Sequence, residues 1–131
     1  MAAAQAVFEQ SQIAARQATT SGIATAQAAV NEAEANARKA QADLDRMRQL
    51  AAKEEISRLQ FDTYVAAAQV ASAQLKSAQE QLNAARQAAE RAGAEAQAAQ
   101  ARVLQARASL QESRAGQQQV QVNVAQAASA G

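Results

Sequence analysis

Apolar residues recur every seven positions through the second half of the chain. One row runs Phe61, Ala68, Leu75, Leu82, Ala89, Ala96, Val103, Leu110, Gln117 and Val124, and a second row, three positions further on, runs Tyr64, Ala71, Ala78, Ala85, Ala92, Ala99, Ala106, Ser113, Val120 and Ala127. Eighteen of these twenty residues are apolar. Two apolar rows at heptad spacing are typical of a coiled coil. The pattern predicts one long helix over about residues 58–128.

A shorter version of the same pattern precedes it and predicts a first helix over about residues 2–50. Its rows are Ile23, Val30, Ala37, Leu44 and Ala26, Ala33, Ala40, Met47. Upstream of Gly22 the phase slips by one residue, because Phe8 and Ala15 would place the next member at position 22 rather than at Ile23. A slip of one residue predicts a kink or a local unwinding of the helix near residues 19–22.

The heptad is lost between the two patterns, over about residues 51–57, where we expect a tip turn. Ser57 followed by Gln60 has the spacing of a capping box, in which each residue bonds to the backbone N–H of the other. Ile56 and Phe61 have the spacing of a hydrophobic staple at the same helix start. Ser57 and Gln60 are therefore the predicted helix cap.

A reversal at this turn would place the two patterns opposite each other. Met47 would then meet Phe61, and Leu44 would meet Tyr64. Further along, a large residue would face a small one in four successive layers, which are Ala33/Leu75, Val30/Ala78, Ala26/Leu82 and Ile23/Ala85. Interdigitated packing favours such an alternation. We therefore predict an all-α fold, a long antiparallel two-helix coiled-coil hairpin with an Ala-rich seam, forming a single α-hairpin domain over residues 1–131.

Two alternatives remain open at this level. A bent rod that pairs with another chain would use the same apolar rows. The segment after Arg107 would have no partner within the chain under this pairing, and its Val120, Val122 and Val124 alternate as in a short strand. The heptad positions of Val120 and Val124 favour a helix there.

Composition excludes several classes of protein. The chain has 41 Ala and 22 Gln, with no Pro, His, Cys or Trp, so zinc-finger, haem and Ser-His-Asp chemistry are absent, and we expect no cofactor and no metal site. Net charge is +1 with both signs spread along the chain, which does not indicate nucleic-acid binding. No apolar run is long enough to span a membrane, and no signal peptide is visible.

Enzymatic activity is not expected either. The carboxylates Asp43, Asp45, Glu54, Glu55 and Asp62 gather only loosely around an exposed turn. General acid–base catalysis depends on groups whose surroundings bring their pKa close to the working pH. A membrane-surface helix is also disfavoured, because it would carry bulky apolar residues where this chain carries alanine.

The sequence around the turn, residues 44–62, resembles the hairpin tip of HlyD/EmrA/AcrA-type periplasmic adaptors, also called membrane fusion proteins. In that family an Arg is followed by a Leu four residues on and by a Ser seven beyond the Leu, and Arg46, Leu50 and Ser57 match this spacing. The segment 56–62 also matches the family pattern I-S-x-x-x-[YF]-D. One departure is that the family often has Gly in the turn, where this chain has Lys53, Glu54 and Glu55.

The resemblance implies a function and a setting. Hairpins of this family stand in a ring of six in the periplasm and dock through their tips to a TolC-type outer-membrane channel. The rest of such a protein is anchored at the inner membrane and contacts the transporter, so the chain would be part of a longer protein. Arg46, Leu50 and Ser57 would be the partner-binding residues of an efflux pump or type I secretion system.

Each of these residues also has an ordinary structural role. Arg46 suits a solvated helix surface, Leu50 suits the last layer of the core, and Ser57 suits a helix cap. The alternative function is a generic structural coiled coil that oligomerises without a channel partner.

Overall fold

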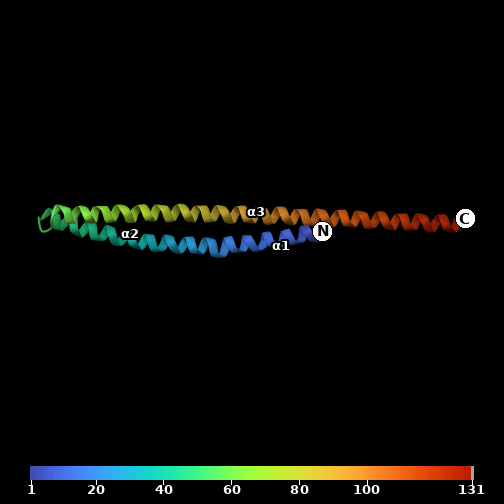
Figure 1. Cartoon of the computed structure of the whole chain (residues 1–131), viewed down its shortest axis with the longest axis horizontal. Coiled ribbons are helices and arrows are strands. Elements are labelled where there is room, and N and C mark those ends of the chain that lie inside the picture. Colours follow the sequence, from blue (N-terminus) through green and yellow to red (C-terminus); the bar gives the residue numbers. More distant parts are fainter. Residues whose placement is uncertain (131) are drawn as a thin grey trace. The chain divides into compact units, whose positions relative to one another are not determined.

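The computed structural model describes residues 1–130, and they form four helical elements (Figure 1). These are α1 (Ala2–Gln17), the π-helix η1 (Ala18–Gly22), α2 (Ile23–Ala52) and α3 (Arg58–Ala130). Ala, Gln, Glu, Lys and Arg are strong helix formers, and no proline interrupts them. No residue within 1–130 lies in a strand. Val120, Val122 and Val124 are therefore helical, and the strand alternative is wrong.

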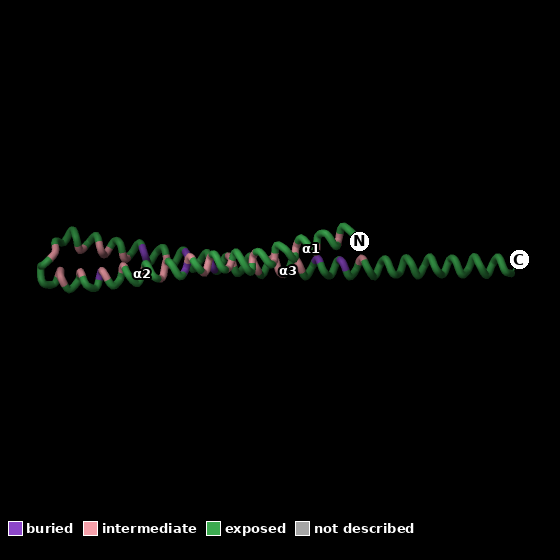
Figure 2. The backbone as a smooth tube through the Cα atoms, turned by 90° about the horizontal axis from the view of Figure 1, so that it is seen from below, coloured by how far each residue is buried: buried purple, intermediate pink, exposed green. Residues whose placement is uncertain are grey.

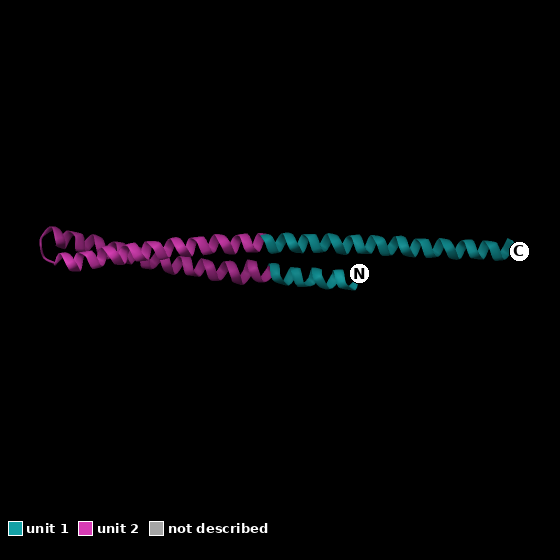
Figure 3. Ribbon diagram, turned by 45° about the horizontal axis from the view of Figure 1, so that its top comes forward, with its two compact units in different colours: residues 1–15, 91–131 teal, residues 16–90 magenta. Residues whose placement is uncertain are grey.

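The chain divides into two compact units, which are coloured separately in Figure 3. Unit 1 combines Met1–Ala15 with the part of α3 from Arg91 onward. Unit 2 is Arg16–Glu90 and contains η1, α2 and the first part of α3. Unit 1 thus combines two segments that are distant in the sequence, whereas unit 2 is one continuous stretch.

The core of unit 2 lies between α2 and the first part of α3. Its buried cluster contains Val30, Ala78 and Leu82, against which four partly buried residues pack, namely Ile23, Ala26, Ala33 and Leu75. Nearer the turn, Met47 and Leu50 share a groove with Tyr64. Later residues of α2 therefore contact earlier residues of α3. In the cluster, large and small side chains come from both helices, as interdigitation requires.

Burial along α3 follows the two heptad rows. Its buried residues are Ala71, Ala78, Leu82, Ala99 and Val103, and all of them belong to those rows (Figure 2). The side chains are small or β-branched at four of these five positions. From Arg107 to Ala130 every residue is exposed.

The phase slip near Gly22 is absorbed by η1. Half-buried residues fall at Ala15 and Ala18 before the slip, and at Ile23 and Ala26 after it. The step from Ala18 to Ile23 is thus one residue longer than the heptad allows. A π-turn closes its hydrogen bond over five residues instead of four and so accommodates one extra residue within a helix. The local unwinding predicted from the sequence is confirmed.

Unit 1 has its own contact between α1 and α3. Gln5 and Phe8 of α1 line a small pocket together with Val103 and Arg107 of α3. Beside it, Ala99 and Val103 are 1% and 4% exposed, the lowest values in the chain together with that of Val30. An apolar residue at each of these α3 positions therefore has a helix to pack against.

Candidate docking tip

The turn after α2 is closed by a Schellman motif, which satisfies carbonyls that the helix end leaves free. The backbone N–H of Glu55 donates to the carbonyl of Leu50 at 2.9 Å, and that of Glu54 donates to the carbonyl of Ala51 at 3.0 Å. Glu54 has φ of 59°, in the left-handed region. Glycine is the usual residue at this place in the motif, because a side chain disfavours that conformation. In this chain a glutamate, Glu54, occupies the position that glycine usually takes, and its backbone is strained.

The start of α3 is closed by both hydrogen bonds of a capping box. The backbone N–H of Gln60 donates to Ser57 Oγ at 3.1 Å, and the backbone N–H of Ser57 donates to Gln60 Oε1 at 3.2 Å. Ser57 and Gln60 thus satisfy two donors that a helix start leaves unpaired. Ile56 and Phe61, the staple pair, are both half-buried.

Arg46 lies on the exposed surface of α2 and is held by its own helix. Its guanidinium forms an ion pair with Asp43, one turn earlier. The Arg46 side chain remains 70% exposed, whereas that of Asp43 is 26% exposed. The arginine fork is therefore oriented by a half-buried carboxylate and still faces solvent.

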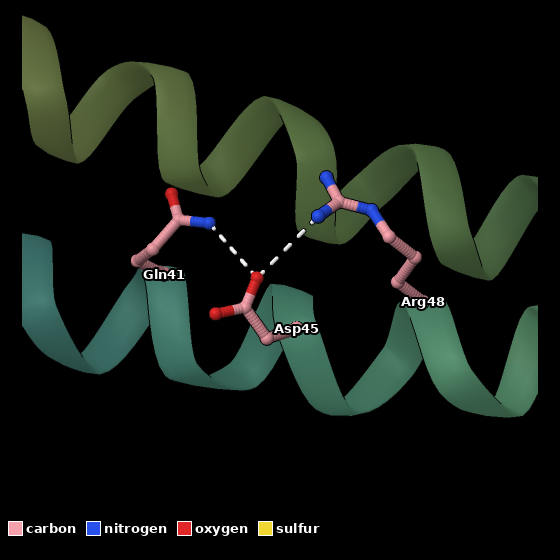
Figure 4. A network of polar contacts seen from close by, with 3 residues as sticks. All are labelled: Gln41, Asp45 and Arg48. Atoms are coloured by element: carbon pink, nitrogen blue, oxygen red, sulfur yellow. Dashed lines mark hydrogen bonds and ion pairs between the residues drawn. The ribbon is translucent and has the colours of Figure 1, made fainter.

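A second polar cluster accompanies it on α2 (Figure 4). Asp45 Oδ1 accepts a hydrogen bond from Gln41 Nε2 at 3.1 Å and lies 3.5 Å from Arg48 Nη1. All three side chains come from α2, so this cluster stabilises the helix and does not cross to α3. Pairs three or four residues apart on an exposed helix contribute a few tenths of a kcal/mol each.

Leu50 is half-buried at the end of α2 and lines a groove at the tip. The other lining residues are Met47, Ile56, Gln60, Thr63 and Tyr64. Gln60 joins this groove to Ser57 through the capping box. Of the three predicted docking residues, only Leu50 lines this groove, while Ser57 borders it through its hydrogen bonds with Gln60 and Arg46 does not line it.

Sequence reasoning missed one residue at the tip. Leu59, in the first turn of α3, is 78% exposed, the highest value among the large apolar residues that stand out from the surface. It lies outside both heptad rows, and a leucine outside the rows of a coiled coil was the available signal.

The described residues hold neither a metal-binding group nor a membrane-spanning helix. Within residues 1–130, no group of three or more Asp and Glu side chains is placed to hold a metal ion. In the same range, none of the helices combines the length and the apolar character that crossing a membrane requires. No protein-family model, curated protein or solved structure matches the chain.

Proposed function

We propose that the chain is the periplasmic adaptor hairpin of a tripartite efflux pump or type I secretion system, and that its tip docks to a TolC-type outer-membrane channel. In this proposal α2 and α3 form a long antiparallel two-helix coiled-coil hairpin with an Ala-rich seam. The opposite order of contacts along α2 and α3 supports it. The buried alanines Ala71 and Ala78 support the close helix approach that such a seam needs.

The observation that carries the proposal is the combination of the Arg46, Leu50 and Ser57 spacing with a well-closed turn. A scaffold that only oligomerises has no need for these three residues together at its tip. The Schellman motif and the capping box fix the backbone on both sides of the turn. A partner therefore meets a preorganised surface, and less conformational entropy is lost on docking.

Each tip residue has a distinct part in the proposed contact. Arg46 presents a planar set of donors that suits a carboxylate or backbone carbonyls on the partner. A guanidinium has five N–H donors, so Arg46 can contact the partner while it stays paired with Asp43. Leu50 and Leu59 supply the apolar contacts, and the Ser57 hydroxyl both caps α3 and faces the partner.

The proposal includes the wider assembly that the resemblance implies. Six hairpins stand side by side in a ring in the periplasm, the parent protein is anchored at the inner membrane, and its remaining part contacts the inner-membrane transporter. Six weak tip contacts made together give the ring a high overall affinity for the channel, because each contact after the first is intramolecular.

The test is capture of the channel by a grafted hairpin. Residues 1–131 replace the hairpin of a full-length hexameric adaptor, and a TolC-type channel is copurified with it. We compare the native tip with Arg46→Asp. The matched control is Arg38→Asp, because Arg38 is 81% exposed on the same helix and pairs with Glu34 at 3.7 Å, but lies away from the tip. Both variants remove one intrahelical ion pair, so their helicity by circular dichroism should agree.

Loss of capture in Arg46→Asp with retention in Arg38→Asp is the expected result. Leu59→Ala should also weaken capture. Equal capture by all variants would move the contact away from the tip, and no capture by the native tip would contradict the proposal.

The second candidate is a structural coiled coil that self-associates without a channel. One specific observation favours it, namely that the heptad rows continue along the exposed part of α3. Self-association of the native chain together with a complete lack of channel capture would support this candidate.

A further inference from the structure

The heptad rows of α3 continue beyond the contact with α1. Up to Val103 the rows are covered, and Val103 is 4% exposed. Beyond it, Leu110, Val120 and Val124 keep the same spacing and are 38%, 60% and 63% exposed. The exposed rows of this segment are Leu110, Ser113, Gln117, Val120, Val124 and Ala127, which we call the open stripe. The open stripe is thus a direct continuation of the α1–α3 interface within unit 1.

A hollow lies on the open stripe at its centre. Its lining residues are Ser113, Gly116, Gln117, Val120 and Gln121. The first four occupy the corners of the hole into which a coiled-coil partner inserts one side chain. Gly116 deepens this hole, because no atom lies within 4 Å of where its Cβ would be. This position can therefore receive one apolar side chain of a partner helix.

The open stripe is complementary to itself when two copies run in opposite directions. One arrangement uses its whole length and leaves the α1 contact in place. Its layers are Leu110 with Ala127, Ser113 with Val124, and Gln117 with Val120, each formed twice by symmetry. Every layer then joins a larger apolar side chain to a small or polar one, as interdigitated packing requires. Val120 of each copy enters the hole beside Gly116 of the other.

A parallel pair lacks this complementarity. In register, it would place Ser113 against Ser113 and Gln117 against Gln117 in successive layers, leaving polar groups facing each other within a narrow apolar stripe. In the antiparallel pair each of these residues faces a valine. A polar residue at such a position sets the alignment of the helices at a cost in stability.

Charges at the flanks do not oppose the antiparallel pair. The open stripe is flanked by Arg114 and Gln121 on one side and by Gly116 and Asn123 on the other. In this arrangement Arg114 faces Gln121 of the second copy, and Gly116 faces Asn123. No like charges meet across the interface, so no repulsion of the kind that destabilises mispaired coils arises.

We propose that the open stripe is a self-association surface, and that two copies of the chain pair antiparallel through residues 110–127. The interface is a single helix pair of modest length, so the dimer is weak and depends on concentration. The proposal does not rest on docking at the tip, and it concerns the chain outside a docked ring, because hairpins that all dock to one channel must run parallel. It assigns a role to the one part of the heptad pattern that has no partner in unit 1.

The first test is the mass of the full chain in solution over a range of concentrations up to about 1 mM, by sedimentation equilibrium. We expect a monomer–dimer equilibrium. Val120→Asp should weaken dimerisation at least about tenfold, because it buries an unpaired charge. The matched control is Val122→Asp, which changes the same residue type at 49% exposure outside the stripe and should leave the dimer unchanged. A native chain that stays monomeric throughout, or equal effects of the two variants, would overturn the proposal.

A second variant separates association from folding. Gly116→Leu fills the hole and should abolish dimerisation, yet it replaces glycine in a helix and should raise helix stability. Gly93→Leu is the control, because Gly93 also lies in α3 with no atom within 4 Å of its Cβ position. Both variants should melt at or above the native temperature, and only Gly116→Leu should be monomeric. Unchanged dimerisation in Gly116→Leu would contradict the proposed hole.

The direction of pairing is tested with single cysteines, since the chain has none of its own. Chains carrying Ser113→Cys are mixed with chains carrying Val124→Cys and oxidised. The antiparallel dimer predicts a disulfide between the two different chains, because these positions share a layer. A disulfide between two Ser113→Cys chains, formed in preference, would indicate parallel pairing and overturn the proposal.

Discussion

The α-helices of the chain are interrupted at two places, at η1 and at the tip. Glycine lies at the interruption with ordinary helical backbone angles, and glutamate lies at the one whose backbone angles favour glycine. At η1 the helical path continues, and Gly22 has φ of −65° and ψ of −49°, which any residue adopts. At the tip the path reverses, and Glu54 has φ of 59°, which favours glycine. Glycine is thus present where it is not needed and absent where it would fit best.

The difference shows what each interruption requires. At η1 the chain has one residue too many for the heptad, and a π-turn absorbs it while the backbone keeps helical hydrogen bonds. At the tip the chain must stop one helix and begin another, so the free carbonyls and N–H groups need new partners. The Schellman motif and the capping box provide them, and the bonds of the Schellman motif hold Glu54 in its strained conformation.

A pair of deletions tests whether the two interruptions differ in this way. Deleting Thr20 removes the extra residue of η1 and should change the free energy of unfolding by no more than about 1 kcal/mol, because Ala18 and Ile23 then take normal heptad spacing. Deleting Gln79, which lies between the buried Ala78 and Leu82, rotates the helix by about 100° and should cost about 3 kcal/mol or more. Urea denaturation followed by circular dichroism measures both. A large loss on deletion of Thr20 would show that η1 does more than absorb a residue.

The next effect concerns the cap of α3. Ser57→Ala removes the acceptor of the Gln60 N–H bond and should lower the free energy of unfolding by about 1 kcal/mol. Ser57→Asp keeps an acceptor and places a negative charge at a helix start, so it should restore most of the loss. Thermal melts of the native chain, Ser57→Ala and Ser57→Asp measure these differences in stability. An unchanged Ser57→Ala chain would mean that the cap does not limit stability.

A smaller effect is expected at Gly22. Gly22→Ala should stabilise the chain by about 0.5–1 kcal/mol, because its backbone is already right-handed and alanine restricts the unfolded chain. Its new Cβ would lie 4.0 Å from the carbonyl oxygen of Gln17, an ordinary contact. A decrease in stability on urea denaturation would show that the π-turn depends on the glycine.

The smallest effect is expected at Glu54. Glu54→Gly should stabilise the turn by about 0.5 kcal/mol, because relief of the left-handed strain exceeds the added flexibility of glycine in the unfolded chain. Glu54→Ala keeps the strain and serves as the control, with little expected change. If Glu54→Gly also reduced channel capture in the grafted adaptor, the glutamate side chain itself would belong to the docking surface.

Part of the tip could be predicted from the sequence and part could not. The capping box was predictable, because Ser57 and Gln60 lie three residues apart and bond only to local backbone groups. The ion pair of Arg46 with Asp43 also has helical spacing, although several acidic residues compete for nearby basic ones and only the folded helix selects the pair. The exposure of Leu59 was signalled by its position outside both heptad rows, and the structure gives its extent, 78%.

From the sequence alone one can predict where the helices lie, that one of them begins at Ser57, and that one residue near Gly22 is out of phase. These features follow from helix propensity and from hydrogen bonds between residues close in the chain. The tertiary structure decided that the extra residue forms a π-turn, that Glu54 adopts a left-handed backbone, and that the rows are covered up to Val103 but open from Leu110 onward. The physical reason is that an apolar row specifies only that a partner is needed, whereas the packing of distant segments decides which part of the row receives one.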